Sequence, residues 1–294
     1  MDPLLLITNA EAGTTDAENI QKALSVLREA GDVEVCSTSN PGELDGVLHR
    51  RGGRRVVVAG GDGSLHAVVA ALHRRQELSE VILGLIPLGT GNDFARGANI
   101  PLDPEEAARL VVKGNVRRVD LLVDCVGQVV VNNVHIGVGA QASRKAHTWK
   151  KRVGRLGYVV GAAIAAVNPP FVRLRVEVDG EEVADFAHPI LMVAVGNGPN
   201  VGGGAEITPE ADPEDGKCDV MVSFAIGPVA RFGYALRFRR GEHHRRDDVR
   251  YVRGSQVTVS GQSFYCSADG EVYGPERHRT WHVEPGAFAM TLPD

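Results

Sequence analysis

Short apolar runs alternate with segments of helical periodicity along the first 114 residues, and this alternation constrains the fold more than any other feature. Expected strands cover residues 4–8, 33–36, 55–59 and 81–86, and expected helices cover residues 15–30, 41–48, 64–75 and 103–114. Asn40 before Pro41 is typical of the start of a helix. Repeated strand–helix units predict a mostly parallel sheet that is covered by helices on both faces.

The pattern changes near residue 120, where most segments become strand-like. Expected strands cover 116–124, 128–135, 172–178, 189–195, 219–224, 256–260 and 288–292, with helices near 155–167 and 229–240. Many are separated by turn signals, which favours a sandwich or two packed sheets. We therefore predict a fold of the class α/β plus β. It has an α/β domain over residues 1–122 and a β-rich domain over residues 123–285. The C-terminal strand, 286–294, lies outside the expected β-rich domain and is an optional addition to the α/β domain.

Composition excludes several classes of protein. The 294 residues are 43% apolar and 23% charged and carry a net charge of −5, so neither disorder nor nucleic-acid binding is indicated. The four cysteines form no C-x-x-C pair, which fits a reducing cytoplasm. The N-terminus has no basic signal region, and the longest apolar stretch, residues 156–167, is too short to cross a bilayer. We expect a cytoplasmic protein that is at most peripheral to the inner face of a membrane.

Two glycine-rich loops follow consecutive expected strands. Residues 60–64 read GGDGS and lead into a helix, and residues 87–96 read PLGTGNDFAR. Glycines let backbone N–H groups approach a phosphate, and the N-terminus of a helix favours an anion. Ligands of open α/β sheets bind beyond the carboxyl ends of the strands, where both loops would lie. A tight turn that uses glycines for shape alone is the competing interpretation of the first loop.

Taken together, these loops and the motifs downstream resemble the diacylglycerol kinase catalytic-domain family, in particular the bacterial lipid kinases. The downstream motifs are GNG at 196–198, GGG at 202–204, Pro209 with Ala211, DG at 215–216 and DGE at 269–271. The resemblance implies a Rossmann-like nucleotide-binding domain and a C-terminal β-sandwich, with ATP, Mg²⁺ and a lipid substrate between them.

The resemblance also implies roles for individual residues. The implied nucleotide-binding residues are Asn9, Thr38, Gly60, Gly61, Asp62, Gly63, Ser64, Leu65, His66, Gly89, Thr90 and Asp93. Asp215, with the backbone carbonyls of Asp212 and Lys217, resembles the magnesium site. Glu271 resembles the proton acceptor, with Asp269 as the rival. The two acids are expected two residues apart on a late strand, where they share a face; a hairpin tip with solvated acids is the alternative.

The chain departs from the family pattern beside the first loop. His66 and Ala67 stand where the family has Asn and Glu, Ser64 replaces Thr, and Ala10 replaces the proline after Asn9. The function indicated is an ATP-dependent transfer of the γ-phosphate to a hydroxyl of a diacylglycerol-like lipid. An NAD kinase-like enzyme and a catalytically weak lipid-binding or regulatory protein remain alternatives, and a homodimer is left open.

Two basic clusters stand near apolar segments. One comprises Arg144, Lys145, Lys150, Lys151, Arg152 and Arg155, and the other comprises Arg231, Arg237, Arg239, Arg240, Arg245 and Arg246. Basic residues beside apolar ones can dock on an anionic membrane. Solvated helix faces explain the same pattern, and the sequence does not decide between the two.

Overall fold

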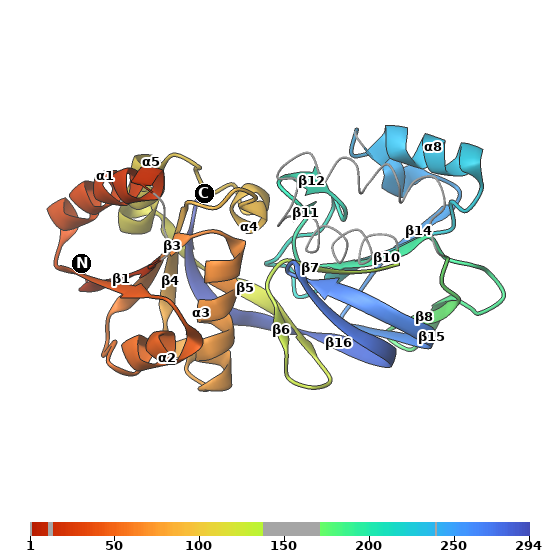
Figure 1. Ribbon diagram of the computed structural model, residues 1–294, viewed down its shortest axis with the longest axis horizontal. Coiled ribbons are helices and arrows are strands. Elements are labelled where there is room, and N and C mark those ends of the chain that lie inside the picture. The colour runs from red at the N-terminus through yellow and green to blue at the C-terminus, as the bar shows by residue number, and fades with distance from the viewer. Residues whose placement is uncertain (1, 11–13, 138–170, 239) are drawn as a thin grey trace.

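The computed structural model describes residues 2–10, 14–137, 171–238 and 240–294 (Figure 1). Four parallel strands form the first part of the sheet, in the order β4-β3-β1-β2. They are β1 (Leu4–Asn9), β2 (Val33–Thr38), β3 (Arg55–Gly60) and β4 (Ile82–Pro87). Because the strands are parallel, their carboxyl ends meet at one edge of the sheet, and the glycine-rich loops begin there.

Helices cover both faces of these strands, as predicted. They are α1 (Thr14–Ala30), α2 (Pro41–His49), α3 (Asp62–Arg74), α4 (Asp93–Gly97) and α5 (Pro104–Lys113), with a short 3₁₀ turn at Leu78–Glu80. Alternation along β1 separates two cores: Leu5 and Ile7 pack with residues of α2 and α3, whereas Leu4 and Leu6 pack with residues of α1 and α5. The Asn40 side chain accepts a bond from the Glu43 N–H at 3.0 Å, which confirms the predicted cap of α2.

The second part of the chain is rich in antiparallel strands and joins the same sheet. The strands are β5 (Asn115–Asp124), β6 (Val129–Val130), β7 (Asn133–Gly137), β8 (Leu174–Val178), β9 (Glu181–Ala184), β10 (Met192–Gly196), β11 (Asn200–Val201), β12 (Ala205–Glu206), β13 (Cys218–Ser223), β14 (Val249–Gly254), β15 (Gln256–Ala268) and β16 (Glu271–Leu292). Helix α8 (Pro228–Phe238) and a 3₁₀ turn at His243–Arg245 lie among them. The sheet runs β14-β13-β10-β7-β15-β16-β4-β3-β1-β2.

Two long strands connect the two parts of the molecule. Strand β16 pairs with β15 in the second part and with β4 in the first, and β5 runs antiparallel beside it (Figure 1). Leu121 of β5 belongs to the core under α2 and α3, whereas its neighbour Leu122 belongs to the core of the second part. The predicted boundary at residue 122 therefore falls inside a strand that both parts share.

Some predicted elements differ in extent from the observed ones. The expected strand 128–135 is split into β6 and β7, while the expected strands 256–260 and 288–292 are pieces of much longer strands. The expected helix 155–167 and the first basic cluster lie outside the described residues. In the part of the chain that is described, no helix is both long and apolar enough to cross a bilayer.

Candidate functional site

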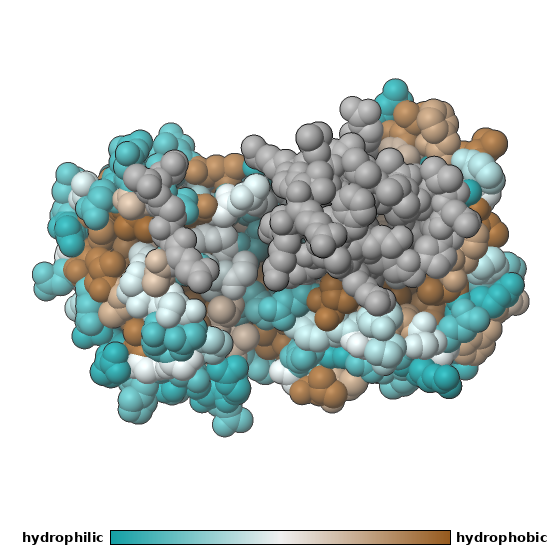
Figure 2. Space-filling view, viewed as in Figure 1, coloured by the Kyte–Doolittle hydropathy of each residue, from teal (hydrophilic) through white to brown (hydrophobic). Residues whose placement is uncertain are grey.

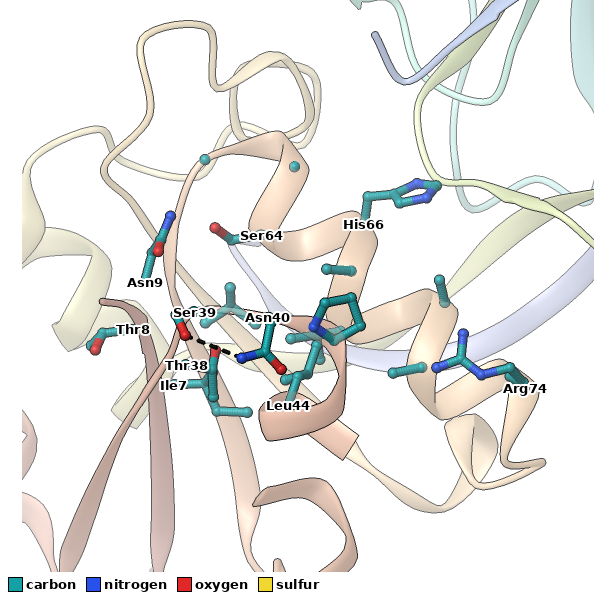
Figure 3. Close-up of a pocket in the computed structure, with 18 of the residues that line it drawn as sticks. Ile7, Thr8, Asn9, Thr38, Ser39, Asn40, Leu44, Ser64, His66 and Arg74 are labelled. Carbon is teal, nitrogen blue, oxygen red and sulfur yellow. Dashed lines mark hydrogen bonds between the residues drawn. The ribbon is translucent and has the colours of Figure 1, made fainter. Parts of the chain in front are cut away.

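A pocket of about 640 Å³ opens where the parallel strands end (Figure 3). The predicted residues that line it are Asn9, Thr38, Gly61, Gly63, Ser64, His66 and Glu271. Ser39, Asn40 and Arg74 also line it, although the sequence did not single them out for binding. Figure 3 shows Asn9, Thr38 and Ser64 around one part of the pocket, and His66 pointing toward the second part of the molecule. The residues predicted at the ends of β1 and β2 thus share one cavity with residues at the start of α3, whereas the predicted Gly60, Asp62 and Gly89 do not line it.

The two glycine loops touch back to back. A Cβ on Gly61 would lie 2.9 Å from the Cα of Gly89, and a Cβ on Gly60 would lie 2.4 Å from the Ser64 hydroxyl. Asn92 closes the second loop: its side-chain oxygen accepts from the Gly89 N–H at 2.9 Å, and its amide donates to the Gly89 carbonyl at 2.8 Å. Glycine is therefore required at Gly61 for packing, whatever it does for a ligand.

The N-terminus of α3 faces the pocket without a side-chain cap. The Ser64 and Leu65 N–H groups bond to the Gly61 carbonyl, so the N–H groups of Asp62 and Gly63 precede the first intrahelical bond. A Cβ on Gly63 would meet nothing within 4 Å. The Leu65 side chain is buried in the hydrophobic core. Open N–H groups at the positive end of a helix dipole form a site for an anion such as a phosphate.

The acids of the glycine loops make contacts that hold the structure together. Asp62 accepts a bond from the Phe94 N–H at 3.0 Å, and Asp93 accepts from the Gly203 N–H at 2.9 Å and the Gly204 N–H at 2.7 Å. Burial raises the pKa of Asp93, against the lowering effect of these N–H bonds. Asp93 thereby links α4 to the GGG turn of the second part. It does not line the pocket with Glu271, and neither does Thr90, which is exposed.

The acids of the DGE motif occupy different positions in the hairpin between β15 and β16. Asp269 and Gly270 form its tip, with φ angles of 46° and 88°, and Glu271 is the first residue of β16. The expectation that Asp269 and Glu271 are alternate positions of one strand is therefore wrong. The alternative of solvated acids fails for Asp269, whose side chain is only 3% exposed.

The Asp269 carboxylate is saturated with donors. It accepts bonds from the Val131, Asn132 and Asn133 N–H groups, at 2.7, 3.0 and 3.2 Å. Its Oδ2 also lies 2.9 Å from Nδ1 of His66, on the pocket-lining face of α3. His66, which departs from the family pattern, therefore connects α3 to the DGE hairpin.

The Glu271 carboxylate is exposed and belongs to the pocket wall. It accepts a bond from the Tyr273 hydroxyl at 2.7 Å. Burial is the main cause that raises the pKa of Tyr273, and the hydrogen bond to Glu271 is the next. The Tyr273 hydroxyl therefore keeps its proton and remains a donor. Of the two predicted acids, only Glu271 lines the cavity beside the N-terminus of α3. This contrast favours Glu271 over Asp269 as the group that meets an acceptor hydroxyl.

We expect the bond between His66 and Asp269 to make stability depend on pH. Burial lowers the pKa of His66, but the Asp269 hydrogen bond and the charges of Asp269 and Glu271 outweigh it and raise the pKa above 6.5. His135, whose pKa burial lowers to about 4, stays neutral near pH 7. Charged His66 contributes fully to the free energy of unfolding below pH 6.5, its pKa in the unfolded chain. This contribution is lost as the pH rises through its higher pKa in the folded protein.

The measurement is the free energy of unfolding between about pH 6 and pH 8, in wild type and in His66→Gln. Glutamine keeps an amide donor but does not titrate in this range. Wild type should lose stability with rising pH relative to the variant. Parallel curves for the two proteins would show that the charge on His66 does not stabilise the fold.

The predicted metal residues lie in a loop apart from the pocket. The Asp215 carboxylate accepts from the Lys217 N–H at 2.9 Å and forms an ion pair with Arg253, and Asp212 accepts from the Glu214 N–H at 3.1 Å. Within the described ranges, no three acidic, histidine or cysteine side chains are grouped so that they could hold a metal ion. The one predicted carboxylate ligand already has an arginine partner, so this donor set fits Mg²⁺ less well than the α3 N-terminus fits a phosphate.

Comparison with known proteins agrees with this arrangement. Residues 3–123 match the family model described as the diacylglycerol kinase catalytic domain, and residues 132–292 match the model described as the YegS C-terminal NAD kinase beta sandwich-like domain. The fold is thus the predicted one, with an N-terminal catalytic domain and a C-terminal β-sandwich-like domain.

Individual relatives match nearly the whole chain. A "Probable lipid kinase YegS-like" of Xanthomonas campestris pv. campestris (strain 8004) is 34% identical over 98% of this chain and 94% of that protein. The protein of the same name from Stenotrophomonas maltophilia (strain K279a) is 37% identical over 81% of this chain and 78% of its own. A crystal structure of a diacylglycerol kinase from Bacillus anthracis str. Sterne shares the fold, with a TM-score of 0.79 at 24% identity, over 99% of this chain and 97% of that one. The chain therefore belongs to the diacylglycerol kinase family of lipid kinases, among its YegS-like members.

Proposed function

We propose that the protein is an ATP-dependent lipid kinase that phosphorylates a hydroxyl of a diacylglycerol-like lipid. One observation carries the proposal: the open N-terminus of α3 and the Glu271 carboxylate line the same pocket. A phosphate site and a proton acceptor in one cavity are what phosphoryl transfer to a hydroxyl requires. Family membership and the names of the relatives, which specify lipid kinases, support the same activity.

Each part of the pocket has a task in this reaction. ATP supplies the γ-phosphoryl group, and the N–H groups of Asp62 and Gly63 bind its phosphates, with the Ser64 hydroxyl beside them. Glu271 takes the proton from the acceptor hydroxyl while the new O–P bond forms and the bond between the β- and γ-phosphates breaks. Asp269 acts indirectly, because it fixes the hairpin that carries Glu271.

The decisive experiment compares acceptors. Purified protein is incubated with labelled ATP and magnesium, with either diacylglycerol in mixed micelles or NAD, and the labelled product is identified. We expect label in the lipid. Label in NAD would replace the proposal with the NAD kinase alternative, and no transfer to any lipid in a screen would leave a binding or regulatory protein.

Nucleotide binding is best tested at Gly63 rather than at Gly61. Gly61 packs against Gly89, so a side chain there disturbs the fold, whereas a side chain on Gly63 enters open space at the pocket wall. Gly63→Val should weaken ATP binding at least tenfold, or about 1.4 kcal/mol, by titration calorimetry. Gly31→Val is the matched control, because Gly31 is also uncrowded but lies before β2, at the opposite edge of the sheet. Equal ATP affinity in the two variants would show that the N-terminus of α3 does not bind a phosphate of ATP.

Magnesium binding at the 212–217 loop is a second proposal, tested by separating two roles of Asp215. If Asp215 holds a metal with the Asp212 and Lys217 carbonyls, Asp215→Ala should raise the magnesium concentration needed for half-maximal turnover. Arg253→Gln removes the ion pairs of Arg253 with Asp215 and Asp219 but keeps the Asp215 carboxylate, so it should leave that concentration unchanged. If both variants lost stability but kept the wild-type magnesium response, the Asp215 carboxylate would act only as the ion-pair partner of Arg253.

A further inference from the structure

Helix α8 packs against the second part of the molecule through one face. Tyr234 is buried, its ring stacks on Phe238 with centroids 6.1 Å apart, and its hydroxyl lies 3.7 Å from the Met221 sulfur. Tyr234 belongs to a small core with Leu191 and Ile207. This contact fixes which side of α8 faces the protein.

The opposite side of α8 is apolar and exposed. Val229 is 85% exposed, Phe232 67% and Leu236 49%. At about 100° per residue, these three side chains fall within a sector of about 60°, centred opposite Tyr234. The space-filling view shows hydrophobic surface over α8 (Figure 2). A helix that is apolar on both sides contacts the protein core with one side, and its exposed apolar side marks an interaction site.

The charge around this face has one sign. The segment 227–241 contains four arginines and no acid, although the whole chain carries a net charge of −5. The helical spacing places Arg237 about 80° from the nearer edge of the apolar sector, and Arg237 and Arg240 are exposed, whereas Arg231 lies about 100° beyond the other edge with its Nε buried. Exposed apolar side chains on a helix with exposed arginines and no acid match the boundary between acyl chains and anionic headgroups. A second copy of the chain would bring like charges together across a two-fold interface, so this occupant is disfavoured.

We propose that α8 is a membrane-docking helix, in which Val229, Phe232 and Leu236 insert into the outer part of a bilayer and the exposed Arg237 and Arg240 contact anionic lipid headgroups. The proposal goes beyond the phosphoryl-transfer site and rests on the proposed function only in that a diacylglycerol-like substrate resides in a bilayer. Docking through α8 brings the enzyme to the surface that holds its substrate and leaves the ATP pocket unchanged.

The test measures sedimentation with vesicles in the absence of nucleotide. The vesicles contain phosphatidylcholine and phosphatidylglycerol, or phosphatidylcholine alone. The double variant Phe232→Ser/Leu236→Ser should bind mixed vesicles at least tenfold more weakly than wild type. Val126→Ser, at a 69% exposed valine in the turn after β5, is the matched control and should bind as wild type. Arg237→Gln/Arg240→Gln should lose affinity for mixed vesicles, by about fivefold per arginine, and little for phosphatidylcholine alone.

Three outcomes would overturn the proposal: no vesicle binding by wild type at low salt, unchanged binding by the apolar double variant, or a wild-type dimer that this variant converts to monomer while vesicle binding is kept. The last result would make the face an interface between copies. Failure of the proposed function appears differently. Wild type would then phosphorylate neither a vesicle-borne nor a dispersed short-chain diacylglycerol, while the vesicle-binding results could still follow the expected pattern.

Discussion

Glu271→Gln should lower lipid-dependent turnover by about 10²–10⁴-fold while ATP affinity stays at the wild-type value. The reason is chemical: glutamine keeps the size of the side chain and can still accept from Tyr273, but it cannot take a proton from an acceptor hydroxyl. Steady-state turnover with diacylglycerol gives the first quantity, and ATP titration of the same preparation gives the second. Excess magnesium should not restore the rate, since the missing group is a base.

Glu181→Gln is the matched control for this substitution, because Glu181 is an exposed glutamate at the start of β9, outside the pocket. It should keep full turnover. Tyr273→Phe removes only the donor to Glu271 and should have a smaller effect than Glu271→Gln. Near wild-type turnover of Glu271→Gln would exclude Glu271 as the base and return the role to Asp269.

Asp269→Ala should be the most destabilising single change in the hairpin, by about 3–5 kcal/mol. It leaves the N–H groups of Val131, Asn132 and Asn133 and the His66 ring without the acceptor they share. It also places alanine at a φ of 46°, a left-handed conformation that disfavours most side chains. Urea unfolding of both proteins gives the difference.

Asp269→Asn is the comparison that separates these causes, because asparagine tolerates the left-handed conformation and keeps one acceptor oxygen. It should be destabilised less than the alanine variant. His66→Gln should cost less again, since His66 supplies only one of the four contacts. If Asp269→Ala unfolded at the wild-type urea concentration, the carboxylate would not hold the hairpin, and a direct role in the reaction would gain support.

The sequence predicted features whose causes are local. The parallel sheet, the glycine loops and the cap at Asn40 depend on residues a few positions apart, so periodicity and turn chemistry were enough. The roles of Asp93 and Asp269 could not be predicted in this way. Their backbone partners lie 110 and more residues away along the chain, and only the tertiary structure brings them together.

The length of β16 could not be predicted from the sequence for a related reason. Its 22 residues include Gly274, Pro275 and Gly286, which are typical of turns in a single sequence. Pairing with β15, β4 and β5 holds the strand together across these residues. The helix α4 was likewise hidden inside a loop motif, because its five residues are too few to show a helical period.

The continuity of β16 has a mechanical consequence. The strand begins at Glu271 and pairs near its other end, at Ala289 and Met290, with the first two residues of β4, so one backbone connects the acid to the parallel part of the sheet. Its pairing with β5 shifts register between Glu284 and Phe288, where the Gly286 N–H also donates to Asp120 at 2.6 Å. An irregularity of this kind bends a strand. Its geometry therefore sets the direction of the strand that leads back to Glu271, and with it the position of that carboxylate relative to the N-terminus of α3.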